Sequence, residues 1–430
     1  MIVAFPGSTG LAMRPGCGML ADPMRAFAVK LIADIRDLPR SVHVLVGGQF
    51  INRFGGFVMP FLALYLSGRG IDMAHVALVL GAISLGGLLG PVVSGYLADA
   101  IGRRNTIVVA LLSGALTTIA LYHCVSLPQF LSVAFLHGFC SFLYGPAANA
   151  LLTDLVTEEQ RVIAFALMRL AINAGFAAGP AVAGLLFSRA PALIFYGDAF
   201  TTMIFALLAL LFLPHGLRSI AGRVTSPGVI WASWREALVD MTCNRPFVIL
   251  IISSLLMEIA FVQSFNVLAI ATTRHGLSPA EYGIVMGLNG VLIMGLEIPL
   301  NQWARRFDLR RVLVIGFALV GLGCASFGFM RTQGGFFLGM TLFTVGEMLS
   351  LPINMSYASM LAPTAYRGRY FGLRSIIWAV ASMVGSSGVW FYGWMGDTWW
   401  YVAGGIGLLG ALVMMTSLAQ PAVRPAPATV

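Results

Sequence analysis

Long apolar runs, each broken by only a few charged side chains, alternate with short polar segments along this chain. A helix needs about 20 apolar residues to cross the hydrocarbon core of a bilayer. With that length as a ruler, the pattern predicts spanning helices near 42–67, 74–98, 106–126, 128–152, 161–187, 191–214, 246–272, 280–303, 312–331, 334–358, 368–392 and 398–418. The expected fold class is therefore all-α and integral to the membrane, with twelve transmembrane helices.

The longest polar stretch, His215 to Arg245, divides the predicted spans into two sets of six. We therefore predict an N-terminal segment over 1–41, a six-helix bundle over 42–214, a central loop over 215–245, a second bundle over 246–418 and a tail over 419–430. Met24 to Leu38 alternates apolar and charged residues, as an interfacial helix does. The sequence leaves open whether residues 1–20 are native.

The two predicted bundles carry matching residues at a nearly constant separation. Pro146, Arg161 and Phe165 recur 206 residues later as Pro352, Arg367 and Phe371, and Gly70, Gly81 and Gly179 recur as Gly276, Gly287 and Gly385. Two pseudo-symmetric six-helix repeats with a substrate site at their interface are a transporter architecture.

Composition excludes a soluble protein. Hydrophobic residues make up 58% of the chain and charged residues 10%, against roughly 25% charged in soluble domains. So few charges cannot cover a water-exposed surface, so the remaining apolar surface must face lipid. Lys30 is the only lysine and lies outside any G-K-[ST] motif, which excludes an ATP-driven pump encoded by this chain alone.

The net charge of +9 is explained by topology and does not require a nucleic-acid partner. Of the 26 basic residues, nineteen fall on one side of the predicted spans, three lie inside them and four lie on the other side. Those four are Arg69, Arg189, Arg274 and Arg331. The positive-inside rule then predicts that both termini are cytoplasmic. We expect a monomeric, multi-pass protein of a bacterial inner membrane.

The segment between the second and third predicted spans reads GYLADAIGRR, from Gly95 to Arg104. It resembles the G-x-L-a-D-r-x-G-r-r signature of the major facilitator superfamily, with Ala100 where the family usually carries a basic residue. The resemblance covers the whole chain through the repeat and implies two six-helix bundles that transport by alternating access. It assigns gating roles to Gly95, Asp99, Gly102, Arg103 and Arg104.

An unpaired carboxylate at the membrane boundary is costly, so Asp99 should find partners. Arg103, one turn on, and Asp154, at the end of the fourth span, are expected to form a cluster with it. The resemblance implies that this cluster latches the two bundles together on the cytoplasmic side. The alternative is a static determinant of topology without a gating role.

The fifth span contains Gly175-x-x-x-Gly179-Pro180-x-x-Ala183-Gly184. This pattern is similar to the G-x-x-x-G-P-x-x-G-G motif of antiporters and exporters within the family. Small residues let helices approach closely, and proline bends a helix. The motif favours an exporter, while ordinary small-residue packing is the alternative.

Charged side chains inside apolar spans are functional candidates, because their burial is expensive. They are Arg53, Arg169, Glu258, Glu297, Glu347 and Arg374. We expect Glu347 first and Glu258 second to couple protons or recognise cations. The alternative is a permanent structural pair, such as Glu258 with Arg53. His137 could carry a proton or be structural, and Asn52 could line a cavity.

The sequence thus predicts a proton-coupled secondary transporter that exports small amphipathic compounds by drug:proton antiport, with the proton gradient as energy source and no cofactor. Two alternatives remain open: a proton-coupled importer of a small metabolite, and a membrane receptor or assembly factor that does not transport. An enzyme is not expected, because no nucleophile motif or metal-ligand cluster is apparent and the five cysteines are scattered singly.

Overall fold

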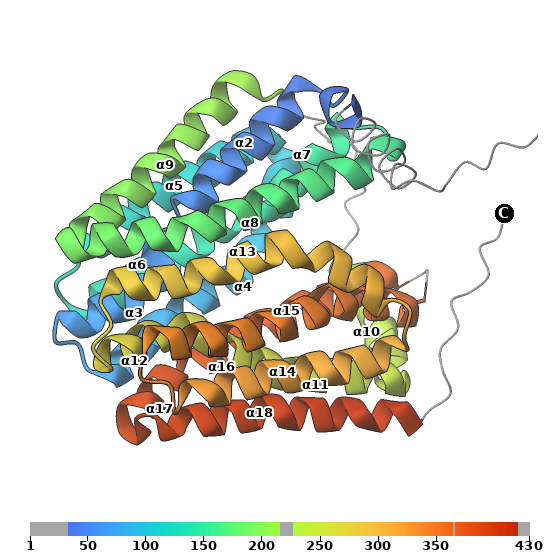
Figure 1. Ribbon diagram of the computed structural model, residues 1–430. Coiled ribbons are helices and arrows are strands. Elements are labelled where there is room, and N and C mark those ends of the chain that lie inside the picture. The colour runs from blue at the N-terminus through green and yellow to red at the C-terminus, as the bar shows by residue number, and fades with distance from the viewer. Residues whose placement is uncertain (1–32, 216–226, 364–365, 420–430) are drawn as a thin grey trace, which may run out of the picture.

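The computed structural model describes residues 33–215, 227–363 and 366–419, shown in Figure 1. The expected N-terminal interfacial helix lies mostly outside these residues, as does the predicted tail beyond 419. Twelve helices or helix pairs in the described residues are long and apolar enough to cross a membrane, which confirms the predicted spans.

The first six spans are α2–α3 (Arg40–Phe54, Val58–Gly68), α4 (Met73–Ala100), α5 (Arg103–His123), α6–α7 (Leu127–Phe142, Tyr144–Leu155), α8 (Glu158–Arg189) and α9 (Ala192–Phe212). The second six are α11–α12 (Arg245–Asn266, Leu268–Arg274), α13 (Pro279–Ala304), α14 (Leu309–Phe327), α15 (Gln333–Leu361), α16–α17 (Arg367–Ser386, Gly388–Met395) and α18 (Thr398–Met415) with the short η1 (Thr416–Ala419).

Several spans are interrupted, which hydropathy alone did not predict. The first span breaks at Gly55–Phe57, between α2 and α3. The Val58 N–H at the start of α3 is bonded by the Asp198 carboxylate of α9, at 3.1 Å. A side chain from another helix thus supplies the acceptor that an unwound helix start lacks within the membrane.

The twelve spans form an N-terminal bundle, α2–α9, and a C-terminal bundle, α11–α18. We call the end at which α9 finishes and α11 begins the linker end, and the opposite end the far end. In Figure 1 the two bundles lie closest toward the far end and diverge toward the linker end. Helices α5 with α9 and α14 with α18 pack at the outer edges of the two bundles.

Glycines bring the bundles together along α8 and α13. A Cβ on Gly283 would lie 2.2 Å from the Pro180 carbonyl oxygen, and one on Gly184 would lie 2.3 Å from the Pro279 carbonyl oxygen. A Cβ on Gly290 would meet the Ala177 backbone at 2.5 Å. Backbone-to-backbone contact of this kind needs glycine on one of the two helices.

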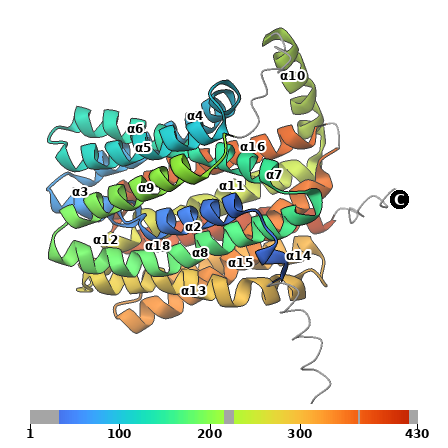
Figure 2. The same cartoon turned by 90° about the horizontal axis from the view of Figure 1, so that it is seen from above.

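The predicted central loop contains a helix, α10 (Pro227–Cys243), at the linker end. Figure 2 shows it lying across the direction of the spanning helices. The Tyr370 hydroxyl of α16 donates to Asp240 of α10 at 2.5 Å, and Asn244 donates to the Leu361 carbonyl at 3.0 Å. The helix is therefore fixed to the C-terminal bundle.

Candidate functional site: the cavity between the bundles

A cavity of about 560 Å³ lies between the two bundles. Its wall is mostly apolar and comes from both sides. The N-terminal bundle contributes Met59, Leu80, Ile83 and Phe142, and the C-terminal bundle contributes Phe261, Phe265, Met355 and Trp378. Arg374 is the charged residue among the lining side chains. Volumes of 300–1,000 Å³ with few polar groups suit small organic ligands.

A second cavity, of about 610 Å³, adjoins the first at Met355. Its lining includes Asn301 and Arg305, at the linker end of α13, and Phe371 near the start of α16. This second cavity is lined by the C-terminal bundle and lies toward the linker end.

Contacts between the bundles close the far end. The Tyr282 hydroxyl of α13 donates to the Pro60 carbonyl of α3 at 3.1 Å, and the Tyr282 and Phe61 rings lie 5.1 Å apart. Helix α12 also packs on α3, and α17 packs on α4, where Gly393 meets Met73. The two bundles are thus in contact at the far end, and their helices diverge toward the linker end (Figure 1).

Glu258 and Arg374 form a buried ion pair at the cavity wall. The Glu258 side chain is 0% exposed and that of Arg374 is 7% exposed. Arg374 Nε also donates to Asn354 Oδ1 at 3.1 Å, and Asn354 Nδ2 donates to Ser254 Oγ at 2.6 Å. This network connects α11, α15 and α16 within the C-terminal bundle.

The alternative pairing of Glu258 with Arg53 is wrong. Helix α11 packs against α16, which brings Arg374 to Glu258, whereas Arg53 belongs to α2 of the other bundle. Arg53 is exposed and makes no hydrogen bond or ion pair with any residue that the structure describes.

Glu347 lies beside an ion pair that joins the two bundles. Its Oε2 accepts a 2.6 Å hydrogen bond from Asn289 Nδ2, which also donates to Thr344 at 3.0 Å. Arg169 of α8 pairs with Glu297 of α13 across the interface between the bundles. The charges of both residues act on Glu347. The structure therefore gathers three of the six predicted intramembrane charges into one group, which we call the Glu347 group: Arg169, Glu297 and Glu347.

The remaining candidates in the N-terminal bundle make local contacts. Asn52 Nδ2 donates to Thr202 Oγ1 at 3.1 Å. His137 is buried, with Nδ1 3.2 Å from Thr117 Oγ1 and 3.4 Å from Thr118 Oγ1. It lies in the contact between α5 and α6 and is not among the residues that line the central cavity.

The signature segment at the linker end is only partly assembled. Arg103 pairs with Asp154 and donates to the Ala150 carbonyl at 2.6 Å. Gly102, at the start of α5, has φ +92°, a conformation that favours glycine. Arg104 lies 2.7 Å from the His215 ring nitrogen.

The expected cluster of Asp99, Arg103 and Asp154 is wrong for Asp99, because only Arg103 and Asp154 pair in this structure. The Asp99 side chain is exposed and makes no hydrogen bond or ion pair within the described part of the chain. Gly95, one turn earlier, is exposed as well, and nothing lies within 4 Å of the position that a Cβ would occupy there. The two residues share one open face of α4, because positions i and i+4 of a helix lie on the same side.

The glycines of the antiporter-like motif face two neighbours. A Cβ on Gly175 would lie 2.7 Å from the Phe54 nitrogen, and one on Gly179 would lie 2.6 Å from the Phe54 carbonyl oxygen, so both face α2. Gly184 and Pro180 face α13 of the other bundle. The motif lets α8 approach both helices at once, as small residues predict.

Two polar residues at these sites received no specific role from the sequence. Asn289 lies inside the predicted span 280–303, and it is the hydrogen-bond partner of Glu347. Asp198 lies inside the predicted span 191–214, and its carboxylate accepts the Val58 N–H at the start of α3. The available signal was their burial in apolar spans, which is costly unless a partner is present.

Comparison with known proteins identifies the family. The model of the Major Facilitator Superfamily matches residues 45–386 and 259–429, which together cover most of the chain. The chain belongs to the major facilitator superfamily. It is accordingly a membrane transporter of small molecules and not an enzyme.

Three bacterial relatives within the superfamily are informative. The Na(+), Li(+), K(+)/H(+) antiporter of Planococcus maritimus is 26% identical over 411 residues, covering 89% of this chain and 95% of that protein. The MFS-type transporter YttB of Bacillus subtilis is 30% identical, with 78% and 84% covered. The multidrug resistance protein MdtH of Proteus mirabilis is 22% identical, with 73% and 78% covered.

Solved structures share the fold. The nucleoside transporter NupG superposes with a TM-score of 0.75 at 16% sequence identity, covering 89% of this chain and 100% of that one. At this identity the likeness extends to the arrangement of the twelve helices alone.

Proposed function

We propose that this superfamily member is a proton-coupled antiporter of a bacterial inner membrane that exports small amphipathic cations. The linker end and both termini are cytoplasmic, in keeping with the distribution of arginines. The cavity between the bundles then faces the cytoplasm and takes up cargo there. The observation that carries the proposal is the Glu347 group at the interface between the bundles, and the antiporter and multidrug relatives support it.

The cavity lining favours an organic compound over a bare alkali ion. Phe261, Phe265 and Trp378 offer apolar and aromatic surface to a ligand. An alkali ion instead needs a set of oxygen atoms to replace its hydration shell. We therefore infer that the cargo has an apolar body and a positive charge.

The net charge of the Glu347 group explains why a proton would be exchanged for a cationic substrate. With all three side chains ionised, Arg169, Glu297 and Glu347 sum to one negative charge. An excess charge is costly to seal inside the hydrocarbon zone. Either a proton or a cationic substrate at Glu347 neutralises the group, so the occluded state is reached with one or the other. If the transporter changes between its inward-open and outward-open states only when the Glu347 group is neutral, it must carry either a proton or a cation in each direction. It then exchanges protons for cations.

Glu258 is the second candidate for the proton site. Its pair with Arg374 is already neutral, and protonation of Glu258 would leave the Arg374 charge facing the cavity. For this reason we place the exchange at Glu347 and a positioning role at Glu258. The Gln variants of the two residues distinguish these assignments.

The open face of α4 provides the latch. When the linker end closes, Gly95 and Asp99 meet the opposite bundle, while Arg103 and Asp154 hold the start of α5 in place. The Asp99 carboxylate is then exposed in one conformation and partnered in the other, so its interactions shift the balance between the two.

The proposal is tested in inverted membrane vesicles, whose interior corresponds to the outside of the cell. An acid interior should drive accumulation of a fluorescent lipophilic cation, and collapse of the pH gradient should release it. Glu236→Gln, an exposed carboxylate of α10, serves as a control that keeps wild-type uptake. Uptake that ignores the pH gradient, or movement of the dye in the opposite direction, would contradict proton-driven export.

A further inference from the structure

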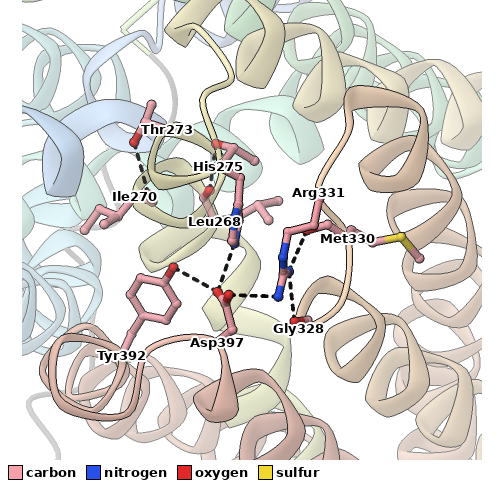
Figure 3. Close-up of polar contacts among 10 residues, drawn as sticks. Leu268, Ile270, Thr273, His275, Gly328, Met330, Arg331, Tyr392 and Asp397 are labelled. Carbon is pink, nitrogen blue, oxygen red and sulfur yellow. Dashed lines mark hydrogen bonds and ion pairs between the residues drawn. The ribbon is translucent and has the colours of Figure 1, made fainter.

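A polar cluster at the far end centres on Asp397, in the turn between α17 and α18 (Figure 3). Asp397 Oδ1 lies 3.1 Å from His275 Nε2 and accepts a 3.2 Å hydrogen bond from the Tyr392 hydroxyl. Asp397 Oδ2 lies 3.1 Å from an Arg331 guanidinium nitrogen. One carboxylate therefore receives donors from three segments: the α12–α13 turn, the α14–α15 turn and α17.

The carboxylate of Asp397 makes these tertiary contacts and does not cap the first turn of α18. Asp397 occupies the N-cap position of α18 but makes no side-chain capping bond. Asp72 and Asp308 hold the same position on α4 and α14, and both accept first-turn N–H groups, from Ala74 and Arg310 at 3.0 Å. Capping is the usual use of an N-cap aspartate, so the tertiary contacts account for the orientation of Asp397.

The cluster joins the two parts of the C-terminal bundle that close the far end. His275 directly follows α12, and the guanidinium of Arg274, the last residue of α12, lies 4.7 Å from the centre of the Tyr392 ring of α17. Helix α12 packs on α3 of the other bundle, and α17 packs on α4. These two contacts lie on different helices of the N-terminal bundle, and opening the far end must break both.

We propose that Asp397 is a clasp that joins α12 and α17 into one rigid unit, so that both sides of the far-end closure open together. Arg331 anchors this unit to the α14–α15 turn through Asp397 and through the Gly328 and Met330 carbonyls, at 3.0 and 2.8 Å. Charge-assisted bonds from Arg331, and from His275 when protonated, make the carboxylate the centre of the clasp. The inference rests on the proposed function in requiring that the far end faces the outside of the cell and that it opens.

The test is labelling of buried far-end positions with a membrane-impermeant maleimide applied from outside the cell. Ala63→Cys on α3 and Ser386→Cys on α16, which lies against Gly81 of α4, are introduced singly after the native cysteines are replaced. Loss of the clasp favours the open far end, so Asp397→Asn should raise labelling at both positions, by roughly fivefold to tenfold. Asp308→Asn removes the matched aspartate at the linker end and should change neither.

Two further variants keep the result interpretable if Asp397→Asn folds poorly. His275→Gln retains a side-chain donor and should label nearly as wild type does, whereas His275→Ala should raise labelling at both positions. Increased labelling at only one position would show that α12 and α17 open independently and would overturn the clasp, as would unchanged labelling at both. Because the assay uses neither substrate nor pH gradient, its outcome is separate from that of the export experiment.

Discussion

The two bundles repeat the same helices but place different polar groups at equivalent positions. Asn52 in the first span and Glu258 in the seventh stand 206 residues apart. Asn52 makes an uncharged bond to Thr202, whereas Glu258 forms a buried ion pair with Arg374. In the C-terminal bundle, Glu258 and Glu347 each place a buried or half-buried carboxylate in a polar network.

The equivalent turns at Gly70 and Gly276 share a backbone conformation but carry different side-chain contacts. Gly70 and Gly276 have φ values of +78° and +84°, so the backbone is repeated closely. The preceding residue in one half, Arg69, donates to the Cys124 carbonyl at 2.8 Å, while in the other half His275 contacts Asp397. The repeat therefore maintains the helix arrangement, and the residues that depart from it carry the proposed coupling and gating.

The largest expected effect is at the Glu258–Arg374 pair. Arg374→Ala would leave a buried carboxylate without its partner, which costs about 3–5 kcal/mol in unfolding free energy. We expect a strong loss of thermal stability and of transport. The double variant Glu258→Gln/Arg374→Gln should regain much of the stability in a melting experiment, and failure to do so would show that the pair is not the source of the loss.

The next effect concerns Gly102, the residue before α5. The equivalent residue of the C-terminal half is Asp308, before α14. Gly102→Ala introduces a Cβ at φ +92° and ψ 150°, a region used almost only by glycine, at a cost of roughly 1–3 kcal/mol. A fall in melting temperature is expected. Gly145→Ala, where nothing lies within 4 Å of the Cβ position, is the matched control. Equal melting temperatures for the two variants would refute the backbone argument.

A smaller effect is expected at the latch, which the second half lacks because Met360 stands where Asp154 stands in the first. Asp99→Asn should leave stability near wild type, since the carboxylate is exposed, and slow dye transport several-fold by altering the conformational balance. Arg103→Ala should slow it similarly, and the double variant should be less than additive. Normal rates in both single variants would exclude a gating role.

The smallest expected effect is the pH dependence of the stability that Asp308 contributes. Its carboxylate caps α14, whereas Gly102, at the equivalent position before α5, has no side chain to do so. Hydrogen bonding from Arg310 lowers the pKa of Asp308 below its ordinary value. The carboxylate therefore contributes stability above its unfolded pKa, and this contribution is lost as the pH falls through the lower folded pKa. Asp308→Asn should lower the melting temperature slightly at neutral pH and have no effect in acid. A deficit that persists in acid would contradict this linkage.

The sequence predicted the twelve spans because hydropathy over 20 residues reports directly on burial in lipid. The repeat offset and the Gly95–Arg104 signature likewise rest on local sequence. The partner of Glu258 could not be predicted, since Arg53 and Arg374 have equal charge and only the packing of α11 on α16 selects between them.

The Asp397 cluster was also missed, although a signal was present. Arg274 and Arg331 are two of the four basic residues on the side that the positive-inside rule leaves poor in charge, and both contribute to this cluster. Their partners, Tyr392 of α17 for Arg274 and Asp397 for Arg331, are distant in the sequence, and residue spacing does not reveal such contacts.

The most direct test of the account is Glu347→Gln, assayed in the inverted vesicles with Glu258→Gln beside it. Glutamine keeps the size and the hydrogen bond to Asn289 but cannot exchange a proton, so the Glu347 group stays neutral throughout. We expect no dye accumulation driven by the pH gradient, while dye exchange without a gradient persists. If Glu347→Gln still accumulates dye against its gradient, and Glu258→Gln does not, the exchange site is Glu258 and the central claim is wrong.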